Sequence, residues 1–163
     1  MRVFVTGATG FIGSAVVEEL IGAGHSVTAL ARSEEAGKKL SAKGVQPHLG
    51  SLDNMESLRS AAAAADGVIH LAYMHSLSQI PFAQRLRIIF GGLPTGIVSR
   101  FLAVSAEADR RAIDTLGVAL KGSGRPLVTT FGTMGLASSA MGLHGSGWRT
   151  MRPQPTHPAL LER

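Results

Sequence analysis

A segment near the start of the chain combines residue types and spacing that could hold a phosphate group. Residues 6–13 read Thr-Gly-Ala-Thr-Gly-Phe-Ile-Gly, after the apolar run Val3–Val5 and before the amphipathic stretch Ser14–Ala23. A strand, a glycine-rich turn and a helix together bind a nucleotide pyrophosphate, because the first N–H groups of the helix are unpaired and carry about half a positive charge. The segment therefore predicts a nucleotide-binding site.

Each of the three glycines has its own expected role. Gly7 allows a tight turn off the strand, Gly10 allows the phosphates to approach the backbone, and Gly13 lets the helix pack close to the strand. Their spacing is Gly-x-x-Gly-x-x-Gly, whereas the standard dinucleotide fingerprint is Gly-x-Gly-x-x-Gly. Glycines also serve plain turns, so it is the preceding strand that favours a nucleotide. The residues predicted to hold the pyrophosphate are Gly7, Thr9, Gly10, Phe11, Ile12 and Gly13.

No other set of side chains has the spacing of a reactive site. The chain has no cysteine, which excludes disulfides, zinc–thiolate sites and a cysteine nucleophile. None of the six histidines pairs with another at i, i+4 on a predicted helix, so we predict no metal site. The sequence also lacks the Gly-x-Ser-x-Gly turn of a hydrolase nucleophile.

The net charge of +5 is not arranged as a nucleic-acid-binding surface. Residues 76–105 contribute +3 and residues 140–163 contribute +2, while the remainder is balanced. With one Trp and one Tyr, the chain has no basic stripe interleaved with aromatic residues, so we predict no nucleic-acid partner. Its 163 residues, 45% of them hydrophobic, are enough for one globular domain.

The stretch that most resembles a membrane span is Ile88–Ser99. Its 12 residues include three glycines and a proline, and they are too few to cross a bilayer. The N-terminus lacks the pattern of a signal peptide, because Arg2 is followed by a strand-like run and the glycine turn. We therefore predict a cytoplasmic protein that does not contact a membrane.

The elements that must position the glycine turn alternate between short apolar runs and helical patterns. Such alternation predicts parallel strands joined by right-handed crossovers. The predicted fold class is therefore α/β, a Rossmann-like doubly wound parallel sheet of about five strands in the order 3-2-1-4-5. The predicted strands are Val3–Val5, Val27–Ala31, Val45–Leu49, Val68–Ala72 and Leu127–Thr130, and the predicted helices are Ser14–Ala23, Glu34–Lys43, Met55–Ala65 and Ser105–Lys121.

Two segments depart from this alternation. Within a nucleotide-binding domain at residues 1–137, residues 76–104 form either a lid-like insertion that faces the substrate or a surface excursion that packs its own apolar residues. Residues 82–90 inside it are compatible with a helix. Residues 138–163 are rich in Gly and Pro and are predicted to be an irregular or disordered tail.

Residues 1 to about 137 resemble the N-terminal part of an extended short-chain dehydrogenase/reductase of the NAD-dependent epimerase/dehydratase family. The turn at residues 6–13 matches the cofactor turn of that family and carries most of the resemblance. The resemblance implies that Asp53 faces the adenine ring of the cofactor. It also implies that Leu71 and Ala72, in the segment His-Leu-Ala, lie beside the ribose and the nicotinamide.

The resemblance also suggests where substrate would be contacted. The family carries a catalytic Ser or Thr at the end of the fifth strand, where Thr130 is our first choice and Thr133 our second. Asp109 falls on the helix position where many members have a structural Asn. Tyr73, directly after the fourth strand, is expected to pack or to contact substrate rather than to transfer a proton.

The end of the second strand should select the cofactor. An acidic residue there binds the ribose 2′-OH of NAD, whereas Arg accommodates the 2′-phosphate of NADP. This chain has Arg32 and Ser33 at that place and no acid. We therefore expect a preference for NADP(H), with NAD(H) as the second choice. The alternative is that Arg32 is a solvated residue that pairs with Glu34 or Glu35.

The chain departs from the family at the proton-transfer pair. The family's chemistry uses a Tyr and, four residues later, a Lys, both on the helix after the fifth strand. Here the one tyrosine is Tyr73, Leu77 lies four residues on, and neither Tyr nor Lys follows Thr133. Later strands and a C-terminal substrate domain are also missing, so the sequence looks like the truncated N-terminal part of a longer enzyme.

Different functions are compatible with these residues. The resemblance implies an NAD(P)-dependent oxidoreductase or epimerase that transfers hydride between the nicotinamide and a small carbonyl or hydroxyl substrate, for example a nucleotide sugar. The missing pair favours a non-catalytic dinucleotide-binding module or regulator instead. A third alternative is a fragment too incomplete to fold stably. An uncovered fifth strand would favour a homo-oligomer, because an exposed apolar edge invites association.

Overall fold

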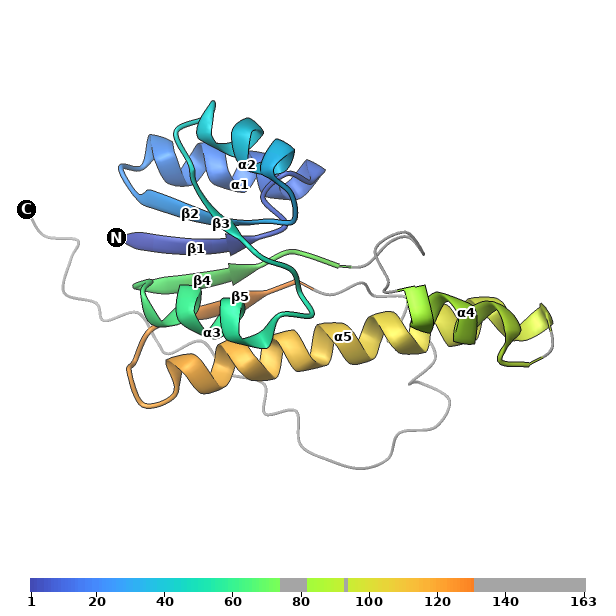
Figure 1. Cartoon of the computed structure of the whole chain (residues 1–163). Helices are drawn as coiled ribbons and strands as arrows, with labels where there is room; N and C mark the ends of the chain where they lie inside the picture. The colour runs from blue at the N-terminus through green and yellow to red at the C-terminus, as the bar shows by residue number, and fades with distance from the viewer. Residues whose placement is uncertain (74–81, 93, 131–163) are drawn as a thin grey trace, which may run out of the picture. The chain divides into compact units, whose positions relative to one another are not determined.

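In the computed structural model, which describes residues 1–73, 82–92 and 94–130, five parallel strands form one sheet (Figure 1). The strand order is β3-β2-β1-β4-β5, so the central β1 pairs with β2 on one side and β4 on the other. The predicted α/β class and strand order are confirmed. The strands are β1 (Arg2–Thr6), β2 (Ser26–Ala31), β3 (Gln46–Leu49), β4 (Gly67–His70) and β5 (Leu127–Thr129).

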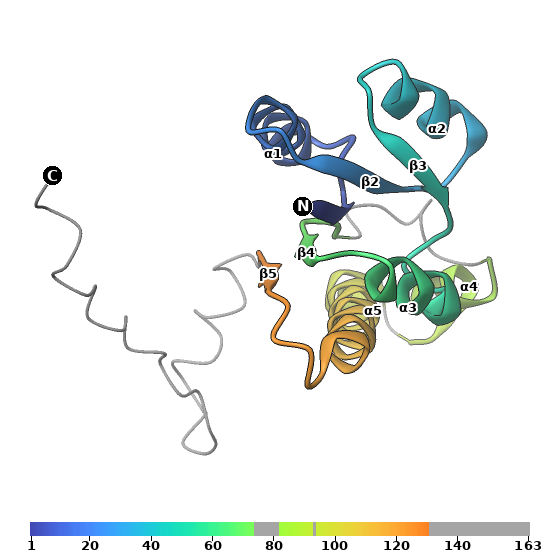
Figure 2. The ribbon, with the colours of Figure 1, turned by 90° about the vertical axis from the view of Figure 1, so that its left-hand side faces the viewer.

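Helices cover both faces of this sheet (Figure 2). One pair, α1 and α2, lies on one face, and α3 and α5 lie on the other, which is the doubly wound arrangement. The segment before α5 folds into α4 and a short 3-10 helix, η2, near the N-terminal end of α5 (Figure 1). The helices are α1 (Phe11–Gly22), α2 (Glu34–Ser41), α3 (Met55–Ala63), α4 (Phe82–Phe90), η2 (Pro94–Gly96) and α5 (Ile97–Leu120).

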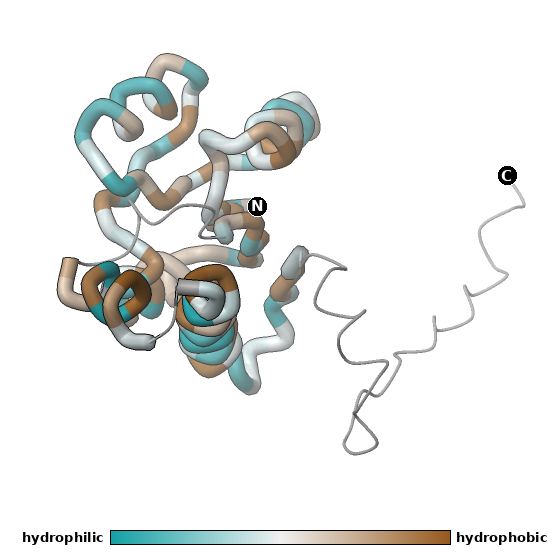
Figure 3. The backbone as a smooth tube through the Cα atoms, turned by 90° about the vertical axis from the view of Figure 1, so that its right-hand side faces the viewer, coloured by the Kyte–Doolittle hydropathy of each residue, from teal (hydrophilic) through white to brown (hydrophobic). Residues whose placement is uncertain are grey.

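Alternate side chains of β1 enter two separate cores. Val5 packs with Val17 of α1, whereas Phe4 packs with Leu58 of α3 and Leu116 of α5. All five side chains are buried. Phe4 and Val5 enter different cores because successive residues of a strand point to opposite faces. Apolar residues, brown in Figure 3, make up much of the strands, while α2 is largely hydrophilic. The two cores fix the strand ends from which the glycine turn leaves.

Several predicted element boundaries differ from those in the structure. Helix α1 starts at Phe11 and not at Ser14, since Gly10 is its N-cap. Strand β4 ends at His70, so the two residues after it belong to a loop. Helix α5 starts at Ile97 and not at Ser105, because the apolar face continues through its first turns and packs on Ile88.

The predictions about residues 76–104 and 138–163 concern segments that the structure describes only in part or not at all. Residues 82–90 form the helix that the sequence allows. Whether residues 76–104 act as a lid stays a prediction, as does the domain boundary at residue 137. The predicted tail 138–163 lies outside the described residues.

Strand β5 forms one edge of the sheet, and Val128 on it is 52% exposed. Association through this edge stays a prediction. In the part of the chain that the structure describes, no helix is both long enough and apolar enough to cross a membrane.

An ion pair fastens the amino end of β1 to the residue before β4. The Arg2 guanidinium donates to Asp66 Oδ1 at 2.8 Å and the Arg2 backbone N–H donates to Oδ2 at 2.7 Å. These two hydrogen bonds lower the pKa of Asp66 from 3.8 to about 2. Because the pKa falls on folding, the ionised carboxylate stabilises the fold above pH 3.8, and this contribution is lost as the pH falls towards about 2.

We expect Asp66→Asn to lower the melting temperature above pH 3.8 and to have little effect near pH 2, where the native carboxylate is itself becoming protonated. Thermal melts of both proteins across this range measure the difference. Asp114→Asn, which removes a more exposed partner of Arg110, serves as the control. A fall in melting temperature on Asp66→Asn that is the same at every pH would contradict this role of the carboxylate.

Candidate functional site

The turn after β1 can be built only with glycine at two of its positions. Gly7 has φ +76°, and a Cβ on it would lie 2.7 Å from the amide nitrogen of Ala72. A Cβ on Gly13 would lie 2.0 Å from the carbonyl oxygen of Gly7, so α1 packs directly on the turn. These contacts press the turn against both the loop after β4 and the first turn of α1.

Gly10 has a different environment, because it is exposed and less crowded than the other two glycines. A Cβ on Gly10 would have one close neighbour, the carbonyl oxygen of Gly7 at 3.2 Å. Its own N–H donates to that oxygen at 3.0 Å, and its carbonyl accepts from the N–H of Ser14 at 2.9 Å. Gly10, the N-cap of α1, has no side chain that could cap the helix. The first N–H groups of α1 therefore remain available to an anion beside an exposed Gly10.

A cleft of about 660 Å³ lies at the carboxyl ends of β1, β2, β3 and β4. This is the edge at which open parallel sheets bind ligands. The structure brings eight predicted cofactor residues together around it. They are Gly7, Thr9, Gly10, Arg32, Ser33, Asp53, Leu71 and Ala72.

Three predicted residues do not line the cleft with their side chains. Phe11 is 96% exposed and Ile12 is 60% exposed, while Gly13 is buried against the turn. They could contact a bound phosphate through their backbone N–H groups alone, because all three lie in the first turn of α1.

Arg32 reaches the cleft from the end of β2 with its guanidinium unpaired. It is exposed, and it makes no hydrogen bond or ion pair with any of the described residues. Its proposed partner Glu35 instead pairs with Lys39 at 2.7 Å. The neighbouring Ser33 caps α2, where its hydroxyl accepts the N–H of Ala36 at 3.2 Å. The ion pair with Glu34 or Glu35 considered for Arg32 is not formed among the described residues, although Arg32 is solvated as that alternative expects.

A series of buried hydrogen bonds supports the wall of the cleft that the loop after β4 forms. The N–H of Ala72 donates to Thr6 Oγ1 at 3.3 Å, and this hydroxyl lies 2.7 Å from His70 Nδ1. His70 Nε2 in turn lies 3.0 Å from Asp109 Oδ1 on α5. Thr6 and His70 are fully buried. If the Thr6 hydroxyl donates to Nδ1, the proton of His70 is on Nε2 and faces the carboxylate of Asp109. Every polar group of this hydrogen-bonded series then has a partner.

Of the two threonines predicted to be catalytic, the structure describes only Thr130. Thr130 follows β5 and donates its N–H to the carbonyl oxygen of His70 at 3.2 Å. It therefore lies at the carboxyl edge of the sheet, although it is not among the residues that line the cleft. Thr133 lies outside the described residues. Tyr73 does line the cleft.

Sequence reasoning missed part of the lining. Ser51 and Leu52 directly precede Asp53 in the same loop, so that loop as a whole was the available signal. Leu30 and Ala36 lie at the end of β2 and in the first turn of α2, next to the predicted Arg32. Among the described residues, no group of three or more His, Cys, Asp or Glu side chains could hold a metal ion.

Comparisons with known proteins agree with the glycine turn and the fold. A family model described as "NAD dependent epimerase/dehydratase family" matches residues 3–87. An uncharacterized protein of Schizosaccharomyces pombe is 40% identical over 161 residues, which are 99% of this chain and 46% of that protein. A Stigmatella aurantiaca ketoreductase that acts on a farnesyl-dihydroquinoline oxide is 45% identical over 76 residues, covering 47% of this chain and 23% of that protein.

Solved structures show the same fold at low sequence identity. A UDP-glucose 4-epimerase from Thermotoga maritima superposes with a TM-score of 0.55 at 20% identity, over 79% of this chain and 37% of that one. The chain spans less than half the length of the S. pombe relative and 39% of a Saccharomyces cerevisiae relative to which it is 39% identical.

Proposed function

The chain belongs to the NAD dependent epimerase/dehydratase family, and on that premise we propose that its cleft binds NADP(H) for an oxidoreductase reaction. The observation that carries the proposal is the uncapped N-terminus of α1 beside the open Gly10, on the wall of the cleft. An anionic pyrophosphate fits there, because it would pair N–H groups that have no partner among the described residues.

The rest of the cofactor would be divided among three loops. Arg32 and Ser33 would bind the 2′-phosphate, since the guanidinium has no other partner among the described residues. Asp53 would face the adenine, and Leu71 and Ala72 would line the ribose and nicotinamide. The hydrogen bonds that connect Thr6, His70 and Asp109 hold the loop with Ala72 in place. When bound, the nicotinamide would donate or accept a hydride.

The substrate class that fits best is a small carbonyl or hydroxyl compound. The family includes epimerases and dehydratases, and the Stigmatella relative is a ketoreductase. In this chain the hydroxyl of Thr130, at the carboxyl edge beside β4, would donate a hydrogen bond to the substrate oxygen. A nucleotide sugar is one compound of this class.

A non-catalytic dinucleotide-binding module is the second candidate. It is favoured by one sequence observation, the lack of a Tyr followed four residues later by a Lys anywhere in these 163 residues. In that case the cleft would bind the cofactor and change conformation or assembly instead of transferring hydride.

Consumption of NADPH across a panel of aldehydes and ketones separates the two candidates. For the enzyme we expect slow turnover of at least one carbonyl compound, with a rate that falls about 100-fold in Thr130→Val, since one hydrogen-bond donor to a reacting oxygen supplies about this factor. Thr28→Val, in the middle of β2, is the control and should keep the wild-type rate. Saturable cofactor binding without consumption across the panel would identify the module.

A further inference from the structure

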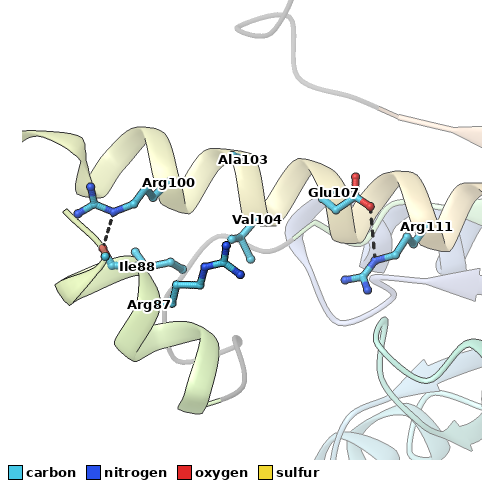
Figure 4. A pocket seen from close by; sticks show the side chains of 8 residues that line it. Arg87, Ile88, Arg100, Ala103, Val104, Glu107 and Arg111 are labelled. Carbon is cyan, nitrogen blue, oxygen red and sulfur yellow. Dashed lines mark hydrogen bonds and ion pairs between the residues drawn. The ribbon is translucent and has the colours of Figure 1, made fainter.

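A second cavity, of about 560 Å³, lies between α4 and the part of α5 from Arg100 to Arg111. Among the described residues, it shares none with the cofactor cleft. Its volume falls within the range of about 300–1,000 Å³ that is typical of small-molecule sites. Figure 4 shows its lining side chains, which are Arg87, Ile88, Arg100, Ala103, Val104, Glu107 and Arg111, together with Gly91.

The cavity has an apolar floor and a positively charged rim. Ile88 is 1% exposed and packs with Val104, and Ala103 continues this surface on α5. Three arginines and one glutamate line the rim. The sequence from residue 67 to residue 106 contains no acidic side chain at all. An anionic ligand would therefore meet an excess of positive charge here.

Two of the arginines keep donors available for a ligand. Arg111 Nε lies 4.0 Å from Glu107 Oε1, a loose contact, and the same glutamate already accepts two hydrogen bonds from Arg110 at 2.8 and 3.1 Å. Arg87 makes no hydrogen bond or ion pair with the described residues. In Figure 4, the guanidinium group of Arg87 reaches from α4 towards Val104 of α5, and that of Arg111 lies on the same side of α5, farther along the helix.

The third arginine supports the frame of the cavity. Arg100 Nε donates to the carbonyl oxygen of Ile88 at 2.8 Å, which ties α5 to α4. This contact fixes the floor residue relative to the rim. The two helices thus present an apolar surface and unsatisfied guanidinium donors to the same volume.

We propose that this cavity binds an organic anion with a hydrocarbon tail, which places its carboxylate or phosphate head at Arg87 and Arg111 and its tail on Ile88, Ala103 and Val104. A purely apolar ligand would not use the guanidinium donors, and a bare inorganic anion would leave the apolar floor in water. Because the described residues that line the two cavities are different, we expect this site to be filled independently of the cofactor.

Calorimetric titration with decanoate and with decyl phosphate, below their micelle concentrations, tests the proposal, and decanol is the neutral comparator. We expect saturable binding of at least one anion and at least about tenfold weaker binding of decanol, as expected for loss of a charge-assisted contact. Arg87→Glu should weaken binding of the anion at least about tenfold. Lys121→Glu, the same charge change at the exposed end of α5, should change the affinity less than about threefold.

A second pair of variants tests the apolar floor. Ala103→Trp should fill the cavity and abolish anion binding, while Ala106→Trp, an exposed position on the same helix that does not line the cavity, should not. Absent saturable binding, equal binding of decanol, or equal losses in variant and control would overturn the proposal. So would binding to phosphatidylglycerol vesicles without binding to either soluble anion, which would indicate a membrane surface instead. Cofactor titrations of the same variants keep a failure of this site distinct from a failure of the cleft.

Discussion

Replacing Gly10 with Asp is expected to abolish dinucleotide binding without unfolding the protein. Gly10 is the N-cap of α1 and has φ −79° and ψ 172°, a conformation that any residue adopts. Asp is among the best N-cap residues, so the helix should be at least as stable as before. Its carboxylate would occupy the helix N-terminus and repel a pyrophosphate there.

The size of the effect follows from the charges involved. A carboxylate about 4 Å from a phosphate costs a few kcal/mol near a protein surface, so we expect at least about 100-fold weaker binding of NADPH. Gly10→Ala adds a Cβ 3.2 Å from the carbonyl oxygen of Gly7 and no charge, and should therefore weaken binding less. Fluorescence titration with NADPH gives the affinities, and a thermal melt checks the fold.

Gly13→Ala provides the contrasting variant for this experiment. Its Cβ would lie 2.0 Å from the carbonyl oxygen of Gly7, so the turn must move and the melting temperature should fall. A Gly10→Asp protein that melts normally and binds NADPH like the wild type would show that the phosphates do not lie at α1.

Replacing Arg32 with Asp is expected to reverse the cofactor preference. The wild-type guanidinium has no competing partner among the described residues, so it is free to bind a 2′-phosphate. Hydrogen bonds to charged groups contribute about 1.5–3 kcal/mol, so their loss should weaken NADPH binding about 10- to 100-fold. The new carboxylate can accept a hydrogen bond from the ribose 2′-OH, so NADH binding should hold or improve.

Two variants accompany this measurement. Lys121→Asp makes the same charge change far along the chain, on the residue that caps the C-terminus of α5, and should leave both affinities unchanged. Ser33→Ala removes the cap of α2, which costs about 1 kcal/mol of stability. It should also weaken the binding of NADPH more than that of NADH. Wild-type protein that binds NADH as tightly as NADPH would contradict the role assigned to Arg32.

The sequence was most informative where a structural requirement is local. The glycine turn could be predicted because Gly7, Gly10 and Gly13 act within a few residues of one another. The strand order could be predicted because the glycine turn, together with the regular alternation of apolar runs and helical patterns, indicates a Rossmann-like sheet with a known order. In both cases the relevant period or spacing is visible in a short stretch of sequence.

Contacts between distant segments could not be predicted in this way. The hydrogen bond between His70 and Asp109 joins residues 39 apart in sequence and depends on how α5 crosses the sheet. The pairing of Glu35 with Lys39, which leaves Arg32 unpaired, was one of several solvated arrangements with similar energies. The early start of α5 was hidden because Gly91, Gly92 and Pro94 resemble a long loop, although Pro94 is the first residue of η2.

The most direct test of the central claim is a titration of the wild-type chain with NADPH and with NADH, followed by nucleotide fluorescence. We expect one saturable site per chain and about tenfold tighter binding of NADPH than of NADH, as a single charge-assisted contact to the 2′-phosphate would give. Failure of folded protein to bind either nucleotide would contradict the claim that the cleft beside Gly10 is a dinucleotide site.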